Sequence, residues 1–218
     1  MGGRARSARR GRRQVDEKPA WLRAHGTPWV RGWGRAIFEN PWITVTEFAA
    51  TAPTGKPARY GLVSFKNYAV AVLPLYDDGT TVLVGQNRFP AGDYSWEIPE
   101  GGGPLEHDPL ESAKRELAEE TGLQAAEWHE VMRAQLSNSV TDEQMFGYLA
   151  LGLSRARAGQ EMDDTEAIEV VRVPFREALD AAMAGDIKDM LTVAMLLKAY
   201  HMAREGHLAS ALARAMLG

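Results

Sequence analysis

Three glutamates, Glu116, Glu119 and Glu120, follow one another at the spacing i, i+3 and i+4 of an α-helix. Their side chains therefore share one helix face, within about 6 Å of helix rise, where their negative charges repel one another. Carboxylate oxygens are hard ligands that suit Mg²⁺ or Mn²⁺, ions that also bind water and substrate phosphates. The three glutamates alone thus leave two interpretations open, a metal site or an acidic face exposed to solvent.

A short helix has to position these glutamates. Asp108 is a favourable N-cap residue, Pro109 fits the first helical position, and Gly122 supplies a left-handed stop. Glu111 is spaced to complete a capping box with Asp108, and the glycines at 101–103 are expected to form a loop that leads into the helix. An apolar stripe runs beside the glutamate face and predicts contact with a core: Leu110, Ala113 and Leu117.

The spacing around the glutamates resembles the signature of the Nudix hydrolases, G-x5-E-x7-R-E-U-x-E-E-x-G-U, in which U is aliphatic. Gly101 is followed after five residues by His107, and after seven more by the run at 115–123. Every fixed position matches except the first glutamate, where His107 stands. The resemblance implies that the three glutamates form a metal site rather than a solvated face.

The same resemblance implies roles for the residues around the metal. Mg²⁺, or alternatively Mn²⁺, would be the cofactor. Arg115 is expected to orient a signature carboxylate, and Glu97 is expected to brace Gly101 and the glycine loop. The expected ligands are the side chains of Glu116, Glu119 and Glu120 and the backbone carbonyl of Glu100.

A closer resemblance, over about residues 28–200, is to the ADP-ribose and nucleoside diphosphate sugar pyrophosphatases of this family. It implies hydrolysis of the pyrophosphate bond to a nucleoside monophosphate and a sugar phosphate. Ser139 stands where relatives specific for ADP-ribose carry a proline, which favours nucleotide sugars in general. The resemblance rests on five short runs of sequence, at 40–42, 65–67, 86–89, 95–102 and 138–143.

Three glutamates are candidates for the residue that activates water. Glu166 lies in an acidic loop at 161–169, where ADP-ribose-type relatives take a catalytic glutamate from a mobile loop. Glu143 is the second candidate and could instead hold substrate, and Glu120 is the third. Glu166 is the preferred prediction.

Substrate binding is expected from an arginine and an aromatic residue. Arg88 ends a predicted strand, and a guanidinium there can clamp phosphate oxygens with two hydrogen bonds. Trp42 can stack on a base, as can Trp29 or Trp33, but each tryptophan also fits a core.

Two alternatives to this activity stay open. One is a Nudix enzyme for another nucleotide, such as a dinucleotide polyphosphate. The other is a non-catalytic Nudix module that senses a nucleotide or associates with nucleic acid, which His107 favours and the intact glutamates disfavour.

Strands precede and follow the signature helix, and helices end the chain, a pattern that predicts an α+β fold. The family resemblance implies a mixed β-sheet sandwiched between helices, with an N-terminal β extension. The expected strands are 42–49, 60–65, 69–76, 81–86, 94–98, 128–136, 145–151 and 170–173, and the expected later helices are 174–184, 189–204 and 207–217.

Four segments are expected along the 218 residues. Residues 1–17 form an Arg-rich tail, with six arginines and no acid in the first thirteen positions, whose composition predicts disorder. The tail could contact nucleic acid, although an idle leader is the preferred interpretation. Residues 18–60 form the β region that the resemblance implies builds a homodimer. Residues 61–206 form the Nudix domain, and residues 207–218 form a C-terminal helix.

The composition limits which other classes of protein are possible. An apolar fraction of 45% is ordinary for a globular chain, and the absence of cysteine excludes disulfides and thiolate metal sites. The longest apolar runs are too short to span a membrane, and no secretory signal is expected. We therefore expect a cytoplasmic protein with no membrane contact, and the family resemblance implies that it acts on a nucleotide.

Overall fold

The computed structural model describes residues 19–156 and 167–218, and the chain divides into two compact units. One unit holds the chain up to Gly34 together with Phe48–Tyr60, and the other holds Arg35–Glu47 together with Gly61–Gly218. The prediction of a disordered tail at 1–17 lies outside the described residues.

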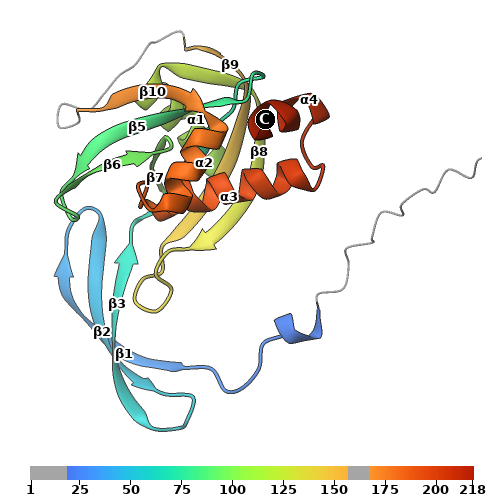
Figure 1. The fold of residues 1–218 in the computed structure, drawn as a ribbon. Helices are drawn as coiled ribbons and strands as arrows, with labels where there is room; N and C mark the ends of the chain where they lie inside the picture. The colour runs from blue at the N-terminus through green and yellow to red at the C-terminus, as the bar shows by residue number, and fades with distance from the viewer. Residues whose placement is uncertain (1–18, 157–166) are drawn as a thin grey trace, which may run out of the picture. The chain divides into compact units, whose positions relative to one another are not determined.

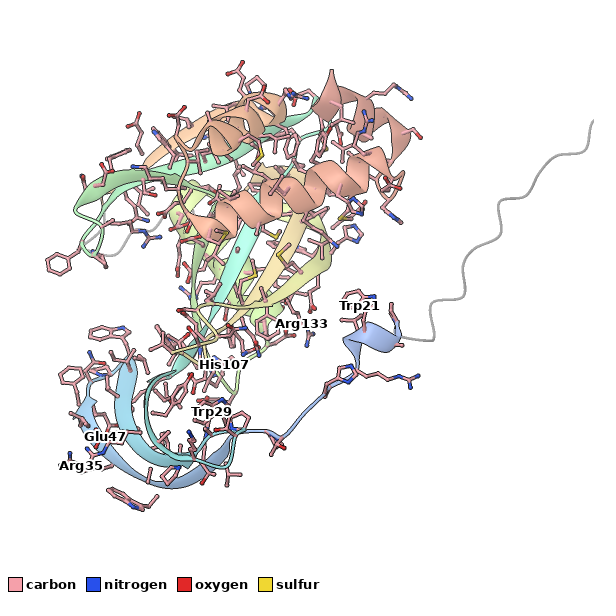
Figure 2. The ribbon with its side chains drawn as sticks, turned by 60° about the horizontal axis from the view of Figure 1, so that its bottom comes forward. Trp21, Trp29, Arg35, Glu47, His107 and Arg133 are labelled. Carbon is pink, nitrogen blue, oxygen red and sulfur yellow. The ribbon has the colours of Figure 1, made fainter. Side chains whose placement is uncertain are left out.

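The N-terminal region builds a small sheet. After a 3₁₀ turn, η1 (Ala20–Leu22), come β1 (Val30–Glu39), β2 (Ile43–Thr51) and β3 (Pro57–Phe65), in the order β1-β2-β3 (Figure 1). Arg35 pairs with Glu47 at 3.8 Å between β1 and β2, and both are labelled in Figure 2. Trp29 packs edge-on against the ring of Tyr60. Every residue of β1 is exposed to solvent.

A mixed four-stranded sheet forms the centre of the second unit. It contains β4 (Asn67–Pro74), β7 (Glu100–Pro104), β8 (Leu123–Gln135) and β9 (Gln144–Arg155), in the order β7-β4-β9-β8. β4 and β9 run parallel, whereas β7 is antiparallel to β4 and β8 is antiparallel to β9. A separate antiparallel sheet has the order β10-β5-β6, from β5 (Thr80–Arg88), β6 (Asp93–Glu97) and β10 (Glu169–Pro174).

Helices cover both faces of the mixed sheet (Figure 1). The chain forms α1 (Pro109–Thr121), α2 (Phe175–Ala184), α3 (Met190–Arg204) and α4 (Ser210–Leu217). Because side chains alternate along a strand, Val70 and Val72 of β4 pack with α1, while Ala71 and Leu73 pack with the core formed by α2, α3 and α4. The predicted α+β fold, a mixed sheet between helices, is confirmed.

The residues that begin and end α1 are those predicted from the sequence. The carboxylate of Asp108 accepts a hydrogen bond from the Leu110 N–H, and Gly122 ends the helix at a φ of 67°. The predicted capping box is wrong, because the carboxylate of Glu111 accepts from Lys114 Nζ instead.

The predicted glycine loop at 101–103 is also wrong, because these residues lie in strand β7. Glycine usually weakens a strand, so the sequence pattern favours a loop. Here a side chain would not fit: a Cβ at Gly103 would collide with Ser112 and with the ring of Tyr68, the residue paired with it on β4. The glycines therefore let a strand pass close to α1.

No helix in the described parts of the chain combines the length and the apolar character needed to cross a membrane.

Candidate active site

Four parts of the fold bring charged side chains to one cavity of about 660 Å³. β5 ends at Arg88, β7 begins at Glu100, α1 carries the signature residues, and the segment between β8 and β9 contributes Glu143. We call this the active-site cavity. Its charged lining residues are Arg88, Glu100, Arg115, Glu116, Glu119, Glu120 and Glu143.

The glutamates of α1 do not form a solvated face. Glu116 is 9% exposed and Glu120 is 5% exposed, because Ala113 and Leu117 anchor the neighbouring stripe of the helix in the core. Glu119 is partly buried and also lines the cavity. Buried carboxylates are retained where they are paired or hold a cation, so the helix presents an acidic group that needs positive charge.

Arg115 supplies part of that charge. Its guanidinium donates to Glu119 Oε2 and to Glu116 Oε1, both at 2.5 Å, and to the carbonyl oxygen of Gly102 at 2.8 Å. These contacts fit the predicted orienting role of Arg115. They also join α1 to β7 without the first signature glutamate.

His107, which stands at the position of that glutamate, lies in the turn before α1 and is exposed (Figure 2). Its N–H donates to the carbonyl oxygen of Pro104, and its own carbonyl accepts from the Tyr68 hydroxyl. It contributes to the turn through its backbone.

The backbone of β7 completes the acidic group. The Glu100 N–H donates to Glu120 Oε2 at 3.0 Å. A Cβ at Gly101 would collide with the carboxylate of Glu116, so only glycine lets the strand lie this close. Carboxylate oxygens beside strand carbonyls form a hard-oxygen donor set, which fits Mg²⁺ or Mn²⁺.

Arg88 is held by two carboxylates. Its Nε donates to Glu97 Oε1 at 2.9 Å, and its Nη2 donates to Glu97 Oε2 at 2.5 Å and to Glu100 Oε1 at 2.9 Å. The hydrogen bonds to Glu97 are the main cause that raises the pKa of Arg88 above its usual range. Glu97 is buried, so it fixes the position of Arg88 at the cavity, whereas the sequence predicted that it braces the glycine loop.

The candidates for the water-activating base are placed unequally. Glu143 and Glu120 both line the cavity. Burial, followed by the nearby charge of Asp142, raises the pKa of Glu143. Glu166, the preferred prediction, lies outside the described residues.

The three tryptophans considered for base stacking are all exposed. Trp42 is 64% exposed and is not among the described residues that line the active-site cavity. Trp29 and Trp33 are also exposed, so none of the three is a core residue of the described chain.

Sequence reasoning missed the side chain of Glu100 and its neighbour Asp189. The sequence indicated only the Glu100 carbonyl, and Asp189 only as the start of a helix. In the structure Asp189 caps α3 by accepting from the Thr192 N–H, while Thr192 Oγ1 accepts from the Ile98 N–H at 2.9 Å. The contact between Thr192 and Ile98 joins residues 94 positions apart, for which no local pattern exists.

A mixed sheet between helices, with a glutamate-bearing helix against a glycine strand, defines the class of Nudix-fold proteins. The NUDIX domain model matches residues 66–193, and the chain belongs to the Nudix family. This confirms the family predicted from the sequence.

Two relatives and one solved structure are similar to the chain. It is 33% identical over 156 residues to "ADP-ribose pyrophosphatase" of Bacillus subtilis (strain 168), which covers 72% of this chain and 84% of the relative. It is 32% identical over 136 residues to "GDP-mannose pyrophosphatase" of Yersinia pestis (strain Pestoides F), which covers 60% and 69%. The fold matches a "Crystal structure of ADP compounds hydrolase" with a TM-score of 0.74 at 19% identity, over 85% of this chain and all of that one.

Proposed function

We propose that this protein is a Mg²⁺-dependent Nudix pyrophosphohydrolase. It splits ADP-ribose and related nucleoside diphosphate sugars into a nucleoside monophosphate and a sugar phosphate. The observation that carries the proposal is the active-site cavity, in which the buried signature glutamates face an arginine held by Glu97 and Glu100. The names of the two pyrophosphatase relatives support the same substrate class.

The charge of the cavity calls for a cation. Five glutamates and two arginines line it, which leaves an excess of three negative charges when all of them are ionised. A pyrophosphate is itself an anion and would be repelled by this lining. A divalent ion held by the carboxylates would offset this repulsion.

The residues that would hold Mg²⁺, or Mn²⁺, are Glu116, Glu119, Glu120 and the carbonyl of Glu100. A bound ion of this kind neutralises phosphoryl oxygens and lowers the pKa of a coordinated water. Arg115 keeps Glu116 and Glu119 in place through its short hydrogen bonds. The Glu100 N–H does the same for Glu120.

Arg88 binds and orients the substrate phosphate. Its guanidinium is fixed by Glu97 on one edge, so the remaining N–H groups can donate to phosphate oxygens without a search over rotamers. The proton of the attacking water goes to a carboxylate, for which Glu166 remains the prediction from the family resemblance. Glu143 is the alternative base among the residues that the structure describes. Its raised pKa suits a proton acceptor near neutral pH.

Three further predictions remain proposals. The protein forms a homodimer through residues 18–60, Trp42 contributes to base binding, and the location is cytoplasmic. A dinucleotide polyphosphate is the alternative substrate. A non-catalytic sensor is the alternative function, which the intact set of signature carboxylates and Arg115 disfavours.

A substrate panel tests the proposal. The full-length protein is incubated with Mg²⁺ and ADP-ribose, ADP-glucose, UDP-glucose, GDP-mannose or diadenosine tetraphosphate, and released nucleoside monophosphate is measured. Turnover of one or more of the diphosphate sugars is expected. Tight nucleotide binding without turnover of any of them would contradict the proposal and favour the sensor.

A further inference from the structure

A second cavity, of about 320 Å³, shares Arg88 and Glu100 with the active-site cavity. Three carboxylates from separate elements line it: Glu97 at the end of β6, Glu100 at the start of β7 and Asp189 at the N-cap of α3. One oxygen of each lies within 4.8 Å of the others. The proposed reaction gives no role to the side chain of Asp189 or to this grouping.

The positive charge near these carboxylates is too small to balance them. Arg88 donates to Glu97 and Glu100, and the N-terminus of α3 adds roughly half a positive charge. Lys188 also lines the cavity, but its ammonium group pairs with Asp93 at 3.1 Å. When all three carboxylates are ionised, they therefore keep an excess of about one and a half negative charges, on the same helix-dipole estimate.

One oxygen of the group has no partner. Glu100 Oε2 is buried and accepts no hydrogen bond from the described residues, on a side chain that is only 10% exposed. Leaving a buried carboxylate oxygen unpaired is costly, and native sites satisfy such atoms with a donor, a water or an ion.

The other two carboxylates have lone pairs to spare. Asp189 Oδ2 accepts from the Thr192 N–H at 2.6 Å, which leaves its second oxygen for another ligand. Glu97 Oε1 accepts from Arg88 Nε at 2.9 Å, and a carboxylate oxygen can accept twice. The group thus offers three carboxylate oxygens beside an open cavity that water can fill.

We propose that Glu97, Glu100 and Asp189 form a second divalent-cation site, separate from the glutamates of α1. All three oxygens lie within 4.8 Å of one another, close enough for a single ion to contact each of them. Mn²⁺ and Ca²⁺ both bind carboxylate oxygens, and water would complete the shell of the ion.

The ion would also act on Arg88. It neutralises the two carboxylates that hold the guanidinium, so more of the positive charge of Arg88 faces the active-site cavity. This consequence rests on the proposed function, whereas the cation site itself does not.

Mn²⁺ binding to the full-length protein tests the site without any measurement of turnover. Glu116→Gln combined with Glu119→Gln weakens the α1 site and provides the background, and bound Mn²⁺ is counted from the loss of the free-ion electron paramagnetic resonance signal. One ion per chain should remain in this background. Adding Asp189→Asn should weaken its binding at least tenfold, and adding Asp186→Asn, in the same cavity but outside the group, should not.

Asparagine caps helices as well as aspartate does, so Asp189→Asn should melt close to the background in EDTA. Adding Glu100→Gln to the background gives a second route to the same tenfold loss if the first variant fails to fold. A background that binds no Mn²⁺, or unchanged affinity in the folded variants, would overturn the proposal. Substrate turnover in the panel described above fails or succeeds independently of this result.

Discussion

Glu100 joins parts of the site that come from different elements. Its N–H donates to Glu120, its side chain accepts from Arg88, and its carbonyl is an expected metal ligand. Burial, followed by the charges of Asp189 and Glu97, raises the pKa of Glu100 well above its ordinary value of 4.5. A single residue therefore connects the proposed metal ligands with Arg88, the proposed phosphate-binding residue.

This raised pKa predicts how stability changes with pH. The folded state of the metal-free protein binds the Glu100 proton more tightly than the unfolded state, so its stability falls as pH rises above about 4.5. Glu100→Gln removes the ionisable group and, with it, this loss of stability at high pH. In EDTA, urea unfolding should find the variant more stable than wild type at pH 8, with the gap closing as pH falls towards 4.5. An equal gap at every pH would contradict the prediction.

The guanidinium of Arg88 is proposed to hold a substrate phosphate. Arg88→Lys keeps the charge but loses the two-pronged contact with Glu97 and the planar donor set. Losing one charged hydrogen bond corresponds to a fall in kcat/KM of about 10- to 100-fold for ADP-ribose. The loss should come mainly from a higher KM, measured by steady-state kinetics. An exposed arginine that pairs within its own helix, Arg176, serves as the control through Arg176→Lys.

Several of these residues could be predicted from sequence and several could not. The spacing of the signature and the family resemblance pointed to the α1 glutamates, Arg88 and Glu143, which the fold brings to one cavity. The partners of Arg88 are set by the pairing of β5 with β6 and by the start of β7, which follow from tertiary structure. No spacing rule in the chain could reveal them.

At the scale of elements, β7 is the main difference from expectation. Its glycines indicate a loop by composition, yet they form an edge of the mixed sheet against β4. The helices α2 and α3 were predicted to within one residue, whereas β8 begins at Leu123, five residues before the strand expected at 128–136. The sequence could not predict strand β7, because glycine is favoured there by the small space that Tyr68, Ser112 and Glu116 leave in the folded protein.

The glycines of β7 give a matched pair of variants. In Gly101→Ala the new methyl group displaces the Glu116 carboxylate, so Mg²⁺ affinity should fall about 10- to 100-fold. In Gly102→Ala the nearest atom lies at 3.5 Å, an ordinary contact, and the loss should be much smaller. Calorimetric titration of Mg²⁺ measures both. Equal affinities for the two variants would contradict the close approach of β7 to α1.

At the scale of the whole molecule, the exposed strand β1 bears on assembly. Large apolar side chains on it are exposed to solvent, and exposed apolar surface of this kind is a candidate for contact with a partner. They are Val30, Trp33, Ile37 and Phe38.

We expect a homodimer in solution. Light scattering coupled to size exclusion should give twice the chain mass of 24.0 kDa, and Trp33→Glu should shift the protein towards the single-chain mass. A wild-type mass of one chain at micromolar concentration would contradict the proposed dimer.

Phosphorus NMR of ADP-ribose with the full-length protein and Mg²⁺ follows the proposed cleavage of the pyrophosphate bond itself. The two pyrophosphate signals should disappear and be replaced by those of AMP and ribose 5-phosphate. EDTA should prevent the change, and Glu120→Gln should slow it at least about 100-fold, as loss of one charge-stabilising group in an active site commonly does. The same rate in Glu120→Gln, or intact pyrophosphate signals with ADP-ribose and every other diphosphate sugar, would contradict the account.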